Sequence, residues 1–135
     1  MTIKLSHTFI QVLDQDEALA FYRDVVGLEL RTDVPFDSWR WLSLSPPSQP
    51  DVEIVLCNPI MARSPEDAEV VRGLVAKGAM DGVIFRVDDL DATFERIRAT
   101  GAEVVQEPID QPYGVRDCAF RDPSGNQVRF ASPKA

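Results

Sequence analysis

Residues 14–30 read DQDEALAFYRDVVGLEL, and this stretch decides the fold. Its first acidic residues suit the N-terminal cap and the positive end of a helix dipole. Apolar residues then recur at helical spacing, at Ala18, Phe21, Tyr22 and Val25. Gly27 ends the predicted helix, because glycine adopts the left-handed conformation of a C-terminal residue with little strain. We therefore predict a helix that is followed at once by a strand over residues 28–31.

The same order of features recurs when the sequence is slid by 74 residues without a gap. The superposed pairs include Ile10 with Ile84, Asp14 with Asp88, and Gly27 with Gly101. Strand-like runs occupy 7–13, 28–31, 39–45 and 52–57 in the first half, and 82–87, 102–106, 116–120 and 127–131 in the second. Each half therefore predicts one βαβββ module.

We expect a single α+β domain of two tandem βαβββ modules, residues 1–61 and 81–135. A linking helix is expected within residues 62–80, because Ser64 and Pro65 form a helix start. One helix covers only one face of a four-stranded sheet, so the two curved mixed sheets are expected to form a cup. Such clefts between modules are common sites for small ligands.

The composition narrows the class of partner. The 135 residues carry 22 Asp and Glu against 14 Lys and Arg, a net charge of −8, which disfavours binding to a nucleic-acid backbone. The acidic balance permits a cationic small molecule but mainly confers solubility. No apolar run has the length of a membrane helix, and no signal peptide is recognised. The two cysteines are far apart in the sequence, which suits a reducing compartment. Taken together, these features lead us to expect a cytoplasmic protein that has neither a nucleic acid nor a membrane as its partner.

Residues 14–30 resemble the first module of the vicinal oxygen chelate superfamily, which includes glyoxalases, bleomycin-resistance proteins and extradiol dioxygenases. FRVDDLD (85–91) and RDPSGNQVRF (121–130) resemble its second module. The resemblance covers nearly the whole chain. It implies a paired βαβββ fold, usually a homodimer, with a small organic molecule in the cup. It does not select a reaction, because one fold hosts many.

The resemblance also implies a divalent metal held by His, Glu or Gln side chains. The corresponding positions here are His7, Val55, Asp81 and Arg129. Val55 cannot coordinate a metal, and the guanidinium of Arg129 is a permanent cation that only donates hydrogen bonds. One alternative set is His7, Glu53 and Asp81, because Glu53 shares a strand face with Val55; it would take zinc, nickel, iron or manganese. Otherwise Arg129 replaces the metal as the positive charge of the cup, or faces solvent.

Strand alternation predicts further residues in the cup. Phe9 and Gln11 follow His7 at two-residue spacing, while Trp39 and Trp41 share one face as either core or a stacking wall. The predicted ligand-contacting residues are Phe9, Gln11, Trp39, Trp41, Glu53, Val55, Phe85, Tyr113 and Arg116.

Three functions remain open. The leading hypothesis is a metal-independent protein that binds a small organic molecule without a cofactor. The second is a metal-dependent lyase, isomerase or dioxygenase that uses His7, Glu53 and Asp81. The third is metal-free catalysis, with His7 as the base and Arg129 stabilising an oxyanion.

Overall fold

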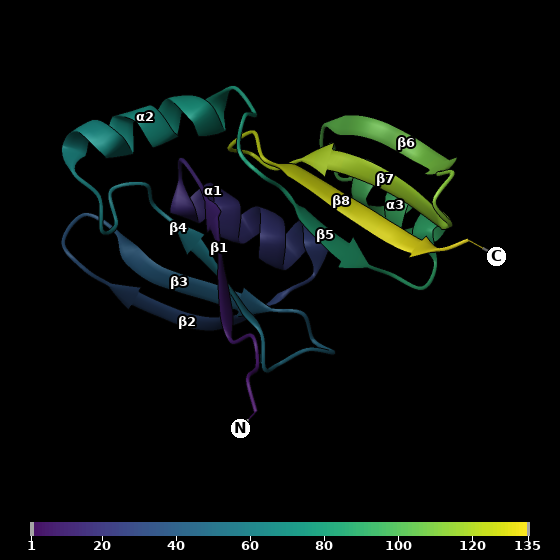
Figure 1. Ribbon diagram of the computed structural model, residues 1–135, viewed down its shortest axis with the longest axis horizontal. Coiled ribbons are helices and arrows are strands. Elements are labelled where there is room, and N and C mark those ends of the chain that lie inside the picture. The colour runs from purple at the N-terminus through teal and green to yellow at the C-terminus, as the bar shows by residue number, and fades with distance from the viewer. Residues whose placement is uncertain (1, 135) are drawn as a thin grey trace.

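The computed structural model describes residues 2–134, in which eight strands form two four-stranded sheets (Figure 1). The first sheet has the order β1-β4-β3-β2 and the second has the order β5-β8-β7-β6. The pairs β1–β4 and β5–β8 are parallel, and the other pairs are antiparallel. The strands are β1 (His7–Gln11), β2 (Glu29–Pro35), β3 (Arg40–Ser45), β4 (Glu53–Cys57), β5 (Val83–Arg86), β6 (Val104–Asp110), β7 (Val115–Arg121) and β8 (Gln127–Pro133).

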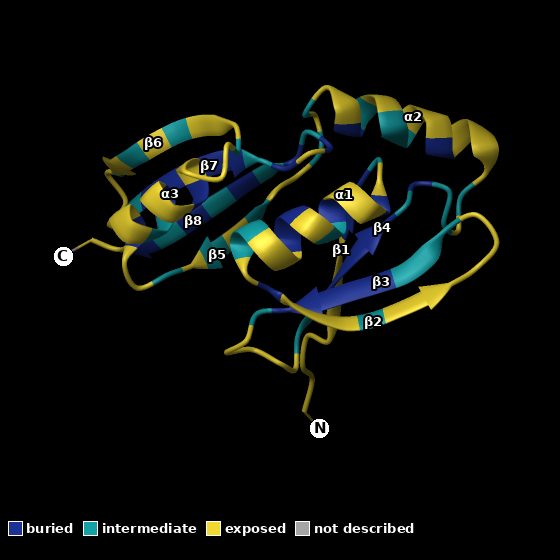
Figure 2. Cartoon of the chain, turned by 180° about the vertical axis from the view of Figure 1, so that it is seen from behind, coloured by how far each residue is buried: buried dark blue, intermediate teal, exposed yellow. Residues whose placement is uncertain are grey.

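The helices complete two βαβββ modules, which confirms the predicted α+β fold. In the first module α1 (Gln15–Ala20) continues into the π-helical turn η1 (Phe21–Val26), and in the second α3 (Leu90–Arg98) follows β5. Helix α2 (Pro65–Ala76) lies between the modules in sequence, and Ser64 caps it as expected. Seen from behind, α1 and α3 lie in front of their sheets (Figure 2). None of the helices within residues 2–134 has the length and apolar composition of a membrane span.

Each sheet has one face against its helix and one face without a helix. The helix-covered faces supply a buried cluster that includes Leu42, Leu44, Ile54, Leu56, Phe120, Val128 and Phe130. Because side chains alternate along a strand, the intervening residues point to the opposite side. We call that side the helix-free face: His7, Phe9, Gln11, Trp41, Ser43, Glu53, Val55 and Cys57 in the first sheet, and Ile84, Arg86, Asp117, Ala119, Arg129 and Ala131 in the second.

The repeat between the modules contains one extra residue that sliding the sequence did not reveal. In the first sheet Val55 pairs with Phe9, and in the second Arg129 pairs with Ile84. Corresponding residues of the two modules are thus 74 positions apart in the last strands, β4 and β8, but 75 positions apart in the first strands, β1 and β5. The helix caps Asp14 and Asp89 also differ by 75.

The extra residue lies in the first helix. A π-helical turn takes up one more residue per turn than an α-helix, and η1 provides such a turn between Asp14 and Gly27. The predicted equivalence of Ile10 with Ile84 is therefore wrong. A shift of one residue moves a side chain to the other face of a sheet.

The buried carboxylate of Asp122 joins the two modules. Its Oδ2 accepts a 2.7 Å hydrogen bond from the hydroxyl of Tyr22 in η1. The same carboxylate accepts bonds of 2.9–3.0 Å from the backbone N–H groups of Ser124, Gly125 and Asn126. Burial, followed by the charge and hydrogen bond of Asp122, raises the pKa of Tyr22 well above its usual value, so the phenol remains a donor.

The turn at 122–126 also holds the end of β1. The Ser124 hydroxyl accepts a 2.8 Å bond from the backbone N–H of Leu13, and the Asn126 side chain donates a 2.7 Å bond to the carbonyl of Gln11. A turn of the second module thereby fixes the strand of the first module that carries the candidate site.

Tyr22→Phe is expected to lower the free energy of unfolding by about 1–3 kcal/mol, because it removes one donor from a buried carboxylate. Urea denaturation followed by circular dichroism measures the change. Tyr113→Phe is the control, since Tyr113 is 70% exposed, and should change stability by less than about 0.5 kcal/mol. Equal stability of the two variants would contradict this role for Tyr22.

Candidate functional site

The helix-free face of the first sheet gathers six of the residues expected to form the site, which are His7, Phe9, Gln11, Trp41, Glu53 and Val55. Parallel pairing sets His7 beside Glu53, Phe9 beside Val55, and Gln11 beside Cys57. His7 and Phe9 are exposed, while Val55 and Cys57 are buried beneath neighbouring side chains. The face therefore presents a polar pair, an apolar centre and a second polar end along the direction of β1.

The first polar end is an internally satisfied pair. His7 Nε2 lies 3.3 Å from one carboxylate oxygen of Glu53, and the Ser43 hydroxyl donates a 2.7 Å bond to the other oxygen. The remaining ring nitrogen of His7 lies 3.0 Å from the hydroxyl of Ser6. Both oxygens of this carboxylate already have partners.

Aromatic rings form the apolar centre. The Trp41 ring meets His7 and Phe9 edge-on, each at a centroid distance of 6.1 Å. Trp39 lies before β3 and instead stacks on Phe36 at 4.6 Å. Trp41 and Phe9 are therefore the aromatic surface available to a flat ligand.

A cavity of about 370 Å³ marks the second polar end. Its lining consists of Phe9, Gln11, Cys57, Met61, Ala62 and Arg63. Arg63 Nη1 donates to the side-chain oxygen of Gln11 at 3.2 Å. Sequence reasoning missed Met61 and Arg63, because they follow β4 in a loop where strand alternation does not apply. Burial raises the pKa of the Cys57 thiol, although Gln11 and Arg63 oppose the shift, so this cysteine is not an activated nucleophile.

In the second sheet, Arg129 belongs to a closed polar network. Arg129 Nη1 lies 3.1 Å from Asp117 Oδ2 and donates to Gln106 at 3.0 Å. The other oxygen of Asp117 accepts bonds from Gln106 at 2.8 Å and Gln111 at 2.9 Å. Burial opposes ionisation of Asp117, yet the hydrogen bonds from Gln111 and Gln106 and the charge of Arg129 hold its pKa below the usual value. Arg129 is thus a fixed cation on this helix-free face.

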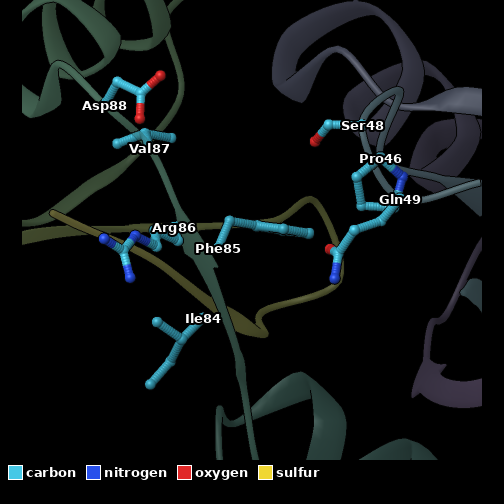
Figure 3. Close-up of a pocket in the computed structure, with 8 residues that line it drawn as sticks. All are labelled: Pro46, Ser48, Gln49, Ile84, Phe85, Arg86, Val87 and Asp88. Atoms are coloured by element: carbon cyan, nitrogen blue, oxygen red, sulfur yellow. The ribbon is translucent and has the colours of Figure 1, made fainter. Parts of the chain in front are cut away.

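Two other expected residues lie away from this face because of the 75-residue offset. Asp81 is exposed and precedes β5, so it does not lie in the strand position that corresponds to His7. Phe85 stacks on the core residue Phe130 at 5.7 Å, on the helix-covered side. Figure 3 shows its ring pointing toward Gln49, away from Ile84 and Arg86, where it lines a cavity of about 560 Å³.

Tyr113 and Arg116 lie at the surface. Tyr113 is 70% exposed in the loop between β6 and β7. Arg116 pairs with Asp91 at 2.9 Å and with Asp110 at 3.3 Å. The hydrogen bonds that Arg116 donates to Asp91 and Asp110 raise its pKa further, which is the behaviour of a surface ion pair.

The donors within one chain do not fit the divalent metal that the resemblance implies. Residues 2–134 contain no group of three His, Cys, Asp or Glu side chains that could hold an ion. His7 and Glu53 provide two donors, but Asp81 does not join them, and Arg129 brings a positive charge to the second sheet. A cation at this position opposes a second cation.

Comparison with known proteins defines the relationships of the chain. The sequence profile of the Glyoxalase/Bleomycin resistance protein/Dioxygenase superfamily matches residues 4–130. The crystal structure of UcmS2 is 41% identical, with a TM-score of 0.87 and coverage of 97% of this chain and 98% of that chain. TnmS3, an antibiotic binding protein from Streptomyces sp. CB03234, is 30% identical, with a TM-score of 0.77 and coverage of 99% of both chains. A probable lactoylglutathione lyase of Synechocystis sp. (strain ATCC 27184 / PCC 6803 / Kazusa) is 28% identical over 93% of this chain and 92% of its own length.

Acid is expected to remove the stabilisation that Asp117 supplies. Its pKa is lowered in the folded state, so its contribution is present above the unfolded pKa of about 3.9 and is lost as the pH falls through the folded value. Asp117→Asn should therefore flatten the acid side of a plot of unfolding free energy against pH, measured by urea denaturation. Asp37→Asn, at an exposed aspartate, is the control and should keep the wild-type slope. Equal slopes in both variants would contradict the role of Asp117.

Proposed function

This chain belongs to the glyoxalase/bleomycin resistance protein/dioxygenase superfamily, and we propose that it binds an organic antibiotic without a metal and without converting it. The position of Arg129 carries the proposal. It occupies the central strand position where the family resemblance implies a metal ligand, and Asp117 and Gln106 hold it there. A guanidinium suits the oxygen atoms of an organic ligand and opposes a divalent cation.

The first sheet supports a binding role for its helix-free face. Phe9 and Trp41 offer exposed and partly exposed rings beside the buried Val55, which is suited to the flat apolar body of an organic molecule. The antibiotic-binding role of TnmS3, with which the chain shares 30% identity over nearly its full length, favours an antibiotic as that molecule.

We further propose that two copies close the site as a homodimer in the cytoplasm. Within residues 2–134, no ion pair, side-chain hydrogen bond or ring contact joins one helix-free face to the other. Exposed apolar side chains remain on both faces, including Phe9 at 50% and Ile84 at 68% exposure. Docking the first face of one copy on the second face of another would remove this apolar surface from water. The free, buried cysteines suit a reducing compartment.

Binding without turnover is tested by titrating planar aromatic antibiotics of acidic, neutral and basic type. At least one is expected to raise the melting temperature, to titrate by calorimetry in the presence of EDTA, and to be recovered unchanged. Trp41→Ala should weaken binding about tenfold or more, because it removes an aromatic contact. Trp39→Ala is the matched control, since that ring stacks on Phe36 away from the site, and should bind as the wild type does.

Two results would overturn this proposal. One is the failure of the whole antibiotic panel to bind. The other is stoichiometric zinc, nickel, iron or manganese in protein purified without chelators, together with turnover that is lost in His7→Ala. The second result would instead favour a metal-dependent lyase, isomerase or dioxygenase.

The homodimer predicts a solution mass of twice the 15.1 kDa chain in light scattering coupled to size exclusion. Ile84→Asp should shift the protein toward the monomer, because it places a charge on an apolar contact surface. Val70→Asp, at a 62% exposed position on α2, controls for the added charge and should leave the mass unchanged. A monomeric wild type at micromolar concentration would contradict the assembly.

A further inference from the structure

Arg63 is a cation held over the end of the first helix-free face. It lies six residues beyond β4, and its side chain reaches back to Gln11 at the end of β1, with Nη1 donating at 3.2 Å. The same nitrogen donates a 3.3 Å bond to the carbonyl of Pro59. Both bonds use one nitrogen and both acceptors are neutral, whereas a guanidinium offers five N–H donors in a planar fork. Arg63 makes no ion pair with any carboxylate of residues 2–134.

The loop that carries Arg63 has a defined shape. Ala62 adopts a φ of +56°, a left-handed conformation that residues other than glycine seldom take. The side chain of Asn58 accepts a 3.1 Å bond from the backbone N–H of Ile60 within the same loop. A strained alanine persists only where its surroundings fix it, so the loop holds Arg63 in place.

The carboxylates on the two helix-free faces already have hydrogen-bonding or ion-pair partners. Glu53 has partners in His7 and Ser43, and Asp117 has partners in Arg129 and two glutamines. The excess negative charge of the chain therefore lies elsewhere. An acidic ligand would meet an available cation on the first face without an unpaired carboxylate beside it.

The polar groups of the first face also define a direction. Glu53 lies beside His7 at one end of β1, and Arg63 lies beside Gln11 at the other end. Four residues of strand separate these ends by about 13 Å. Phe9 and Val55 lie between them, and the cavity of about 370 Å³ opens at the Arg63 end.

We infer that Arg63 and the cavity beside Gln11 form an acid-binding subsite, which takes an ionised carboxylate or phenolate of a ligand whose apolar body lies on Phe9 and Trp41. This inference rests on the proposed function and adds the chemical class and the orientation of the ligand. A charge-assisted hydrogen bond to the free edge of the guanidinium supplies the recognition. The Glu53 end receives the opposite, uncharged end of the ligand.

Calorimetry with 2-naphthoate and 2-naphthamide tests the subsite, because the two probes share an aromatic body and differ in charge. The wild type is expected to bind the acid more tightly than the amide. Arg63→Gln should weaken the acid about tenfold or more and the amide by less than about threefold. Arg63→Lys should recover part of the affinity for the acid, since it retains the charge without the planar fork.

Arg72→Gln is the matched control. Arg72 lies on α2 and reaches the same loop at Asn58, 3.5 Å away, but does not line the cavity. The Arg72→Gln substitution removes the same positive charge as Arg63→Gln and should leave the affinities for both probes unchanged. In backbone amide spectra, 2-naphthoate should shift the signals of Gln11 and Cys57 in the wild type but not in Arg63→Gln.

The failures of the two proposals are distinguishable. If the antibiotic panel and both probes fail to bind, the proposed function is wrong. If antibiotics bind but 2-naphthoate does not, or if the wild type binds both probes equally, only the acid-binding subsite is wrong. An equal loss of both probes in Arg63→Gln would likewise overturn the subsite, because it would reflect a change of shape and not of charge.

Discussion

The buried carboxylate of Asp122 is the interaction on which the rest of the structure depends. It accepts the Tyr22 hydroxyl from the first module and three backbone N–H groups of its own turn. The same turn holds the last residues of β1 through Ser124 and Asn126. Strand β1 contributes His7, Phe9 and Gln11 to the helix-free face of the first sheet. The hydrogen bonds of this one turn therefore both join the two modules and hold the strand that carries part of the candidate site. A buried charge of this kind is stable only with all its partners in place.

Hydrogen-bonded carboxylates and two guanidinium groups give the two helix-free faces their electrostatic character. Glu53 and Asp117 are satisfied within their own sheets, whereas Arg129 and Arg63 place guanidinium groups at the centre of one face and the end of the other. The net charge of −8 thus describes the outer surface and not the site. On the first face the rings of Phe9 and Trp41 lie beside the guanidinium of Arg63, an arrangement that suits an organic molecule with oxygen acceptors.

The fold was predictable because its signals are local. Caps, glycine stops and apolar periodicity each act within a few residues, and they identified both modules and the linking helix. The faces of the first strands were harder to predict, since a side chain changes face with a shift of one residue. The π-helical turn η1 holds the additional residue, and a gapless comparison could not detect it. Asp81 and Phe85 were consequently expected at the positions that Gly82 and Arg86 occupy in the structure, the equivalents of His7 and Gln11 of the first module.

The sequence by itself determined the tandem modules, the position of Arg129 in its strand, and the shared face of His7, Phe9 and Gln11. These features depend on short-range geometry, which repeats with the period of a strand or helix. Only the tertiary structure decided that Arg63 reaches Gln11, 52 residues earlier in the chain, and that Gln106 and Gln111 join Arg129 around Asp117. Loops bring such groups together through long-range packing, and no local period in the sequence encodes it.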